Sequence, residues 1–180
     1  MLKIARDDFQ QAEQIIVEAQ LGLDKETSTI MFVAPYLMAK ATLRMAQSRA
    51  EEALEVAQEV AEKARQSGMH HFLPEALLIQ GQAFGAMDKL NQAGDVLQDA
   101  RSVATEIGQR RVLWQILAAL AEFEERQGNS SKARTYRHEA RKVIDTIAEH
   151  CGSQLRPSFL SMPAVQAVLQ VSGTSEVPGS

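Results

Sequence analysis

The sequence predicts an all-α protein built from repeated helix pairs. Ala, Leu, Gln, Glu and Arg dominate its 180 residues, and only 5% of the residues are aromatic. This composition favours helices over sheets. Apolar residues recur at helical spacing, as in the segment 54–64, and three segments align without gaps at a spacing of forty residues. Such a spacing is typical of a tandem repeat array.

The aligned segments share small or apolar residues at matching positions. The matching sets are Leu37, Leu77 and Leu117; Ala41, Gly81 and Ala121; Ala53, Ala93 and Ala133; and Val60, Ala100 and Ala140. A small residue where two antiparallel helices cross lets their backbones approach closely. Each segment is therefore predicted to form two helices joined by a short turn, and the turns lie near 47–49, 88–91 and 128–131. Pro74 suits a first helical turn, where its missing amide proton costs nothing.

The repeats predict one domain over residues 1–170. Its parts are a half repeat at 1–26, full repeats at 27–68, 69–108 and 109–150, and a short capping helix within 155–170. Because no pair can bury its apolar face alone, we expect neighbouring pairs to stack around a continuous core. Residues 171–180 are small and polar, so we expect them to be disordered.

Charge and cysteine content limit the cellular compartments and the kinds of partner that the sequence suits. A formal net charge of −4 gives no overall attraction for nucleic acid. A single cysteine, Cys151, cannot form an intrachain disulfide and suits a reducing compartment. The N-terminus lacks the apolar core of a signal peptide, and no segment has the roughly 18 apolar residues of a spanning helix. We therefore predict a cytoplasmic protein with no membrane or nucleic-acid partner.

The repeat pattern resembles the tetratricopeptide repeat. Leu77, Gly81, Phe84, Ala93 and Ala100 carry the resemblance best. The family period is about 34 residues, so repeats of forty are long and resemble those that follow the nucleotide-binding modules of bacterial signalling ATPases and maltose-activator-type regulators. The resemblance covers roughly residues 1–150 and implies a right-handed superhelical array of about 3.5 repeats. An aromatic residue is absent from the first signature position.

The resemblance also implies a binding groove formed by the first helix of each pair. The family's groove positions map onto Met38, Thr42, Met45, Leu78, Gln82, Gly85, Ala118, Glu122 and Glu125. This groove would be apolar and Met-rich at one end and acidic at the other, as in a receptor for a peptide or helix. The methionines could equally belong to the core. The Lys/Arg/Asn clamp that chaperone-type repeats use on a C-terminal carboxylate is missing.

Other polar clusters favour ordinary structural roles over catalysis. His70 and His71 are adjacent and would point about 100° apart on a helix, with no further metal ligand at a suitable spacing. His150 and Cys151 lack a third group to orient a base. The carboxylates Glu122, Glu124 and Glu125 lie on one helix and suit a solvated face better than acid–base chemistry.

A stripe of cations on the last long helix also favours a solvated face. Arg134, Arg137, Arg141 and Lys142 lie at helical spacing, without the interleaved aromatic residues of a nucleic-acid site. We expect this stripe to pair with Glu139. Phosphate-binding glycine motifs are absent from the sequence, so we predict no enzyme activity and no cofactor.

These observations leave three functions open. The first is a protein-interaction or regulatory scaffold, such as a part of a bacterial signalling protein, that holds another protein or peptide in the groove. The second is a homo-oligomerisation scaffold, because no preceding helix covers Ile15, Ile16 and Leu21 in the half repeat. The third is a small-molecule sensor with a Met-lined pocket.

Overall fold

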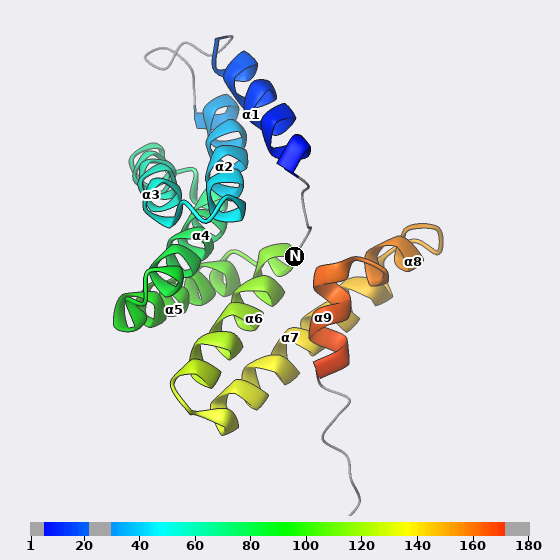
Figure 1. Cartoon of the computed structure of the whole chain (residues 1–180). Coiled ribbons are helices and arrows are strands. Elements are labelled where there is room, and N and C mark those ends of the chain that lie inside the picture. Colours follow the sequence, from blue (N-terminus) through cyan, green and yellow to red (C-terminus); the bar gives the residue numbers. More distant parts are fainter. Residues whose placement is uncertain (1–5, 22–29, 172–180) are drawn as a thin grey trace, which may run out of the picture. The chain divides into compact units, whose positions relative to one another are not determined.

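The structure is a computed structural model that describes residues 6–21 and 30–171, and its fold is all-α, as predicted. The described helices, shown in Figure 1, are α1 (Arg6–Leu21), α2 (Ile30–Ala46), α3 (Ala50–Ser67), α4 (Leu73–Ala86), α5 (Leu90–Glu106), α6 (Arg110–Arg126), α7 (Ser130–His150), α8 (Leu155–Leu160) and α9 (Pro163–Val171), with a 3₁₀ turn η1 (His70–Phe72) before α4. The predicted tail after residue 171 lies outside the described residues, as does part of the predicted half repeat.

The helix pairs α2/α3, α4/α5 and α6/α7 are closed by the same turn. Ser48, Asp88 and Gly128 occupy its left-handed position, with φ of 62°, 60° and 78°. The following amide donates to the carbonyl five residues earlier in each case: Arg49 to Arg44, Lys89 to Phe84 and Asn129 to Glu124, at 2.9, 2.9 and 2.8 Å. This pattern is a Schellman motif, which satisfies carbonyls left free at a helix end. The forty-residue period is therefore also present in the backbone of the turns.

The connection between α3 and α4 has residues typical of a helix end and a helix start. Gly68 closes α3 in the left-handed conformation, with φ of 71°, and its amide donates to the carbonyl of Arg65. Glycine adopts this conformation without the steric cost that other residues bear. Pro74 lies in the first turn of α4, as predicted.

The chain divides into two compact units, one containing α1–α5 and the other α6–α9. In the first unit, α2 packs on α3, α3 on α4, and α4 on α5, while α2 also contacts α4. Gly81 lies against Leu97 of α5, where an added Cβ would lie 2.6 Å from the Leu97 side chain. Buried Gln80 donates to the carbonyl of Ala57 at 3.1 Å, so α4 is joined to α3 by a polar contact within the core.

In this unit, α1 packs against α2 through a charged pair. Phe9, Ala12, Glu13 and Ile16 are its half-buried residues, at the i, i+3, i+4, i+7 spacing of one helical face. Among the α1 side chains that the structure describes, none is fully buried. Glu13 accepts two hydrogen bonds from Arg44 of α2, which is itself only 7% exposed.

In the second unit, α6 and α7 form the pair and α9 packs on α7. The buried cluster in this unit contains Trp114, Leu117, Ala140, Ile144, Val165 and Val168. Val165 of α9 is fully buried within it. The segment predicted as a cap therefore contains two helices, α8 and α9, and the second of them contributes to the core.

Candidate functional site

The nine predicted groove residues fall into three classes of exposure. Thr42, Gln82, Glu122 and Glu125 are exposed. Met45, Gly85 and Ala118 are half-buried. Met38 and Leu78 are buried, with 7% and 4% of their surface exposed. A surface for another molecule can therefore include the first four, whereas Met38 and Leu78 belong to the core of the first unit.

The placement of Met38 and Leu78 corrects the sequence-based mapping. Successive residues of a helix point about 100° apart, so a shift of one position turns an outward residue toward the core. On α2 the outward position is Ala39, which is exposed, and its neighbour Met38 is buried. The repeat pattern gives the spacing of a face but leaves its direction to the packing of the neighbouring helices.

The exposed face of α2 is a continuous uncharged stripe. Its residues alternate at spacings of three and four, which keeps them on one side of the helix. The equivalent positions on α4, which contacts α2, are exposed near the end of that helix. We call this surface the α2/α4 face, and its residues are Phe32, Pro35, Ala39, Thr42 and Ala46 of α2 with Gln82 and Ala86 of α4.

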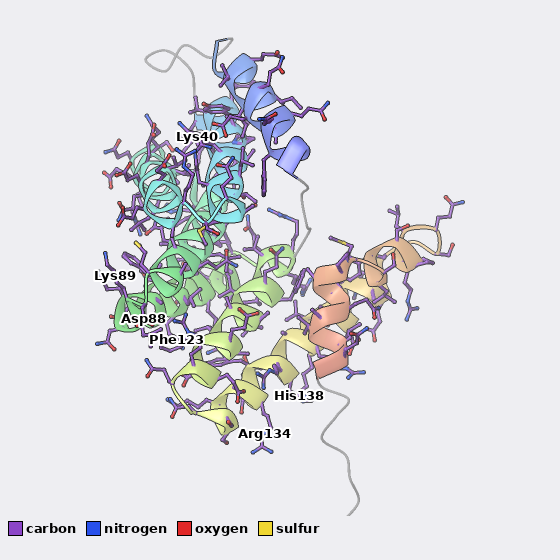
Figure 2. The ribbon with its side chains drawn as sticks, in the orientation of Figure 1. Lys40, Asp88, Lys89, Phe123, Arg134 and His138 are labelled. Atoms are coloured by element: carbon purple, nitrogen blue, oxygen red, sulfur yellow. The ribbon has the colours of Figure 1, made fainter. Side chains whose placement is uncertain are left out.

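The first turn of α2 makes this face strongly apolar at one end. Phe32 is 70% exposed and Met31 is 54% exposed. Pro35 lies within the helix and has no amide proton to donate to the carbonyl of Met31. Figure 2 shows Lys40 on the same helix, where it is half-buried. Lys40 is not part of the stripe on α2, which contains no charged residue.

The mapping missed four α2 residues of this stripe: Phe32, Pro35, Ala39 and Ala46. A helical wheel would have grouped them with Thr42, because all five lie on one uncharged side. That signal cannot tell an outward stripe from a buried one, since uncharged stripes also form cores. Burial against α3 and α4 decides between the two.

Two of the predicted groove residues of α6, Ala118 and Glu125, make contacts within their own unit. Ala118 packs against the cluster around Trp114 and Val165. Glu125 accepts hydrogen bonds from Arg137 at 2.8 Å and from Ser130 at 3.0 Å. Arg137 lowers the pKa of this exposed carboxyl below its usual range.

Two expectations for the charged residues of this unit were wrong in detail. Glu124 is buried, at 5% exposed, and its carboxylate accepts a hydrogen bond from the Asn129 side chain at 2.8 Å. It is therefore not part of a solvated face. Arg137 pairs with Glu125, so its partner belongs to α6, whereas the sequence suggested Glu139 of α7. Arg134, Arg141 and Lys142 are exposed.

Two of the histidines singled out in the sequence make local contacts. The rings of His71 and Phe72 lie against each other with centroids 3.9 Å apart and planes tilted by 41°. His150 Nδ1 lies 2.7 Å from the carbonyl oxygen of Thr146. Within residues 6–21 and 30–171, no three His, Cys, Asp or Glu side chains are placed to hold a metal ion. None of the helices described there has the length and apolar character needed to cross a membrane.

Comparison with known proteins gives a likeness in fold. The chain is similar to the crystal structure of BtubC (BKLC) from P. vanneervenii, with a TM-score of 0.64 and 16% sequence identity. The match covers 94% of this chain and 66% of that chain, so this chain spans about two thirds of the neighbour's length. At this identity the likeness concerns the all-α fold alone. No protein-family model and no curated protein matches the sequence.

Proposed function

We propose that this chain is a tetratricopeptide-like repeat scaffold that binds a peptide or helix of another protein on the α2/α4 face. The observation that carries the proposal is the uncharged stripe of α2 with Phe32 at its end, 70% exposed. Apolar side chains of this size are normally buried, and an exposed group of them is typical of an interaction surface.

The repeat architecture supports a binding role over other uses of this surface. Equivalent turns at Ser48 and Asp88 hold α2 and α4 in equivalent positions within their pairs, so that the outward residues Thr42 and Gln82 recur at the repeat spacing. Repeated helices with small outward residues offer a long surface to an extended or helical ligand. The predicted right-handed superhelix belongs to this proposal.

The composition of the face favours a partner with an apolar stripe. Burial of Phe32 by a ligand would contribute up to about 1.5–3 kcal/mol. Ala39, Ala46 and Ala86 are small, which lets a second helix approach closely. We therefore expect an amphipathic helix that places apolar residues at i, i+3, i+4 and i+7 along α2.

Peptide selection followed by calorimetry tests this proposal. Peptides with helical propensity are selected from a displayed library on the full chain, and the dissociation constant of the best peptide is measured for variants. Phe32→Ser removes the apolar end of the face, and Thr42→Lys places a charge at its centre. We expect each change to weaken binding by at least about tenfold, as at interface hot spots.

Thr105 provides a matched control for Thr42. Both threonines are exposed, and each donates its hydroxyl to the carbonyl four residues earlier, at 2.9 Å for Thr42 and 2.7 Å for Thr105. Thr105 lies on α5 and outside the α2/α4 face. Thr105→Lys should leave the dissociation constant unchanged. Selected peptides that bind the Phe32 and Thr42 variants as tightly as the unchanged chain would contradict the proposal.

A second candidate function is homo-oligomerisation through α1. Ile15 is 60% exposed and Val17 is 50% exposed, and because they are two positions apart they lie on opposite flanks of the face of α1 that packs on α2. We expect such a dimer to strengthen in high salt, because apolar burial drives it. Ile15→Ser with Val17→Ser should then return the mass measured by light scattering to that of one chain, and an unchanged mass would exclude this interface.

A further inference from the structure

The second helices of two repeats carry opposite charges at equivalent positions. Helices α3 and α7 are two repeat periods apart, so a residue of α3 corresponds to the α7 residue eighty positions later. Glu62 corresponds to Lys142, and Arg65 corresponds to Asp145. All four side chains are exposed. At these two positions the outward faces of α3 and α7 therefore carry reversed charge.

Each face continues with charges of its own sign. On α3, Glu51 and Glu55 precede Glu62 on the exposed side, and we call Glu51, Glu55 and Glu62 the α3 acidic face. On α7, the exposed basic residues apart from Lys132, which pairs with Glu124, include Arg134, His138, Arg141 and Lys142, and we call these four the α7 basic face. Arg134 and His138 extend from the side of α7 that is turned away from α6 (Figure 2).

The charged residues of the two faces form no ion pairs within their own units, as far as the structure describes them. None of the residues of the two faces, nor Arg65 and Asp145, forms an ion pair with any residue that the structure describes. Neighbouring charges do: Glu59 pairs with Lys63 at 3.8 Å, and Arg137 pairs with Glu125 at 2.8 Å. Glu62 accepts a hydrogen bond only from the neutral amide of Gln66. Arg134 adds to the effect of Arg137 in lowering the pKa of Glu125, and the other charges of the two faces have no ion-pair partner among the residues that the structure describes.

Charge is also divided unevenly between the two units. Residues 3–107 contain ten Lys or Arg against sixteen Asp or Glu, whereas residues 108–180 contain nine against seven. The first unit is thus net negative and the second net positive. Such a separation steers unlike surfaces of different molecules toward each other.

We propose that α3 of one copy of this chain docks along α7 of a second copy, in parallel and with equivalent positions opposed. In this register Glu62 faces Lys142, Arg65 faces Asp145, and Glu55 lies beside Arg134, so each named contact joins unlike charges. The occupant of the α7 basic face is a second copy because the same chain carries a face of opposite sign, with Glu62 and Arg65 at the positions equivalent to Lys142 and Asp145. The interface is separate from the α2/α4 face and from α1.

The association is electrostatic and therefore weak and sensitive to salt. Exposed ion pairs contribute little individually and are screened by dissolved ions. Light scattering over a concentration series should show a mass that rises with concentration at about 20 mM salt and stays at one chain at about 0.5 M salt. A mass of one chain at every concentration in low salt would overturn the proposal.

A charge exchange identifies the faces involved. One variant combines Arg134→Glu with Lys142→Glu, and the other combines Glu55→Lys with Glu62→Lys. Alone, each variant presents like charges on both faces, so its dissociation constant should rise at least about tenfold. Mixed together, the two variants present unlike faces and should associate again. Recovery on mixing also shows that both variants are folded, and failure to recover would overturn the proposed pairing.

Asp95 and Asp99 of α5 provide the control for net charge. Both are exposed and lie outside the two faces. Asp95→Lys with Asp99→Lys changes the net charge by the same amount as the α3 variant, so it should associate like the unchanged chain. Equal loss in this control would assign the effect to net charge and overturn the proposal. Association that persists in high salt and disappears in the Ile15 and Val17 variant would place the interface on α1 instead.

Discussion

Arg44 and Glu13 join α1 to α2 through a two-pronged ion pair. Arg44 Nη1 donates to Glu13 Oε2 at 2.6 Å, and Arg44 Nη2 donates to Glu13 Oε1 at 2.5 Å. Glu13 stands at the repeat position where the later pairs have Ala53, Ala93 and Ala133. Two parallel hydrogen bonds of this kind fix the orientation of α1 on α2.

Removing the carboxylate should loosen α1 more than the rest of the fold. In Glu13→Ala, the buried Arg44 loses both hydrogen bonds to Glu13. Its remaining carboxylate partner is Glu52, with Arg44 Nε 3.4 Å from Glu52 Oε2. We expect a loss of about 1–3 kcal/mol in the docking of α1, toward the lower end because Glu13 is 35% exposed. Hydrogen exchange should rise in α1 and stay unchanged in α5. Equal protection of α1 in both proteins would contradict the role of the pair.

The same pair predicts a dependence on acid pH. The hydrogen bonds from Arg44 lower the pKa of Glu13 from its ordinary value of 4.5 to about 2. A lowered pKa means that the folded state favours the charged carboxylate, so this contribution is complete above pH 4.5 and is lost as pH falls toward 2. The difference in unfolding free energy between the unchanged chain and Glu13→Gln should be constant near neutral pH and shrink below pH 4.5. Denaturant titrations at several pH values measure it.

Gly81 should not tolerate a side chain. A Cβ at this position would lie 2.6 Å from two atoms of the Leu97 side chain, closer than packed carbon atoms allow. We expect Gly81→Ala to lower the free energy of unfolding by about 1–3 kcal/mol through overpacking, even though alanine favours helix. Adding Leu97→Ala should recover part of that loss. A double-mutant cycle by thermal unfolding tests this, and strictly additive losses would show that the two residues do not meet.

The docking of α9 can be followed through Trp114. This tryptophan is the only one in the sequence, it is 4% exposed, and it shares a cluster with Val165. Val165→Ala should destabilise the second unit by about 1–2 kcal/mol through the loss of buried methyl groups. The tryptophan fluorescence transition should shift to lower denaturant concentration. Ala167 lies on the exposed side of α9, so Ala167→Ser should leave the transition within about 0.5 kcal/mol of its original position.

Much of the local structure could be read from the sequence because its causes are local. The forty-residue spacing and the helical periodicity predicted the three pairs and the positions of their turns. Pro74 marked the start of α4, and Gly68 marked the end of α3. Each of these signals acts through the backbone of a few consecutive residues, so it does not depend on what packs nearby. The all-α fold class follows from the same local preferences.

The direction of each helical face was decided by tertiary packing. Met38 and Ala39 are both uncharged neighbours on α2, and only contact with α3 and α4 places one inside and the other outside. The burial of Glu124 and the pairing of Arg137 with Glu125 likewise depend on how α6 meets α7. The pairing of Arg44 with Glu13 joins residues 31 positions apart, beyond the reach of any helical spacing. Periodicity therefore determined which elements form, whereas the packing of one helix on another determined which side chains remain available to a partner.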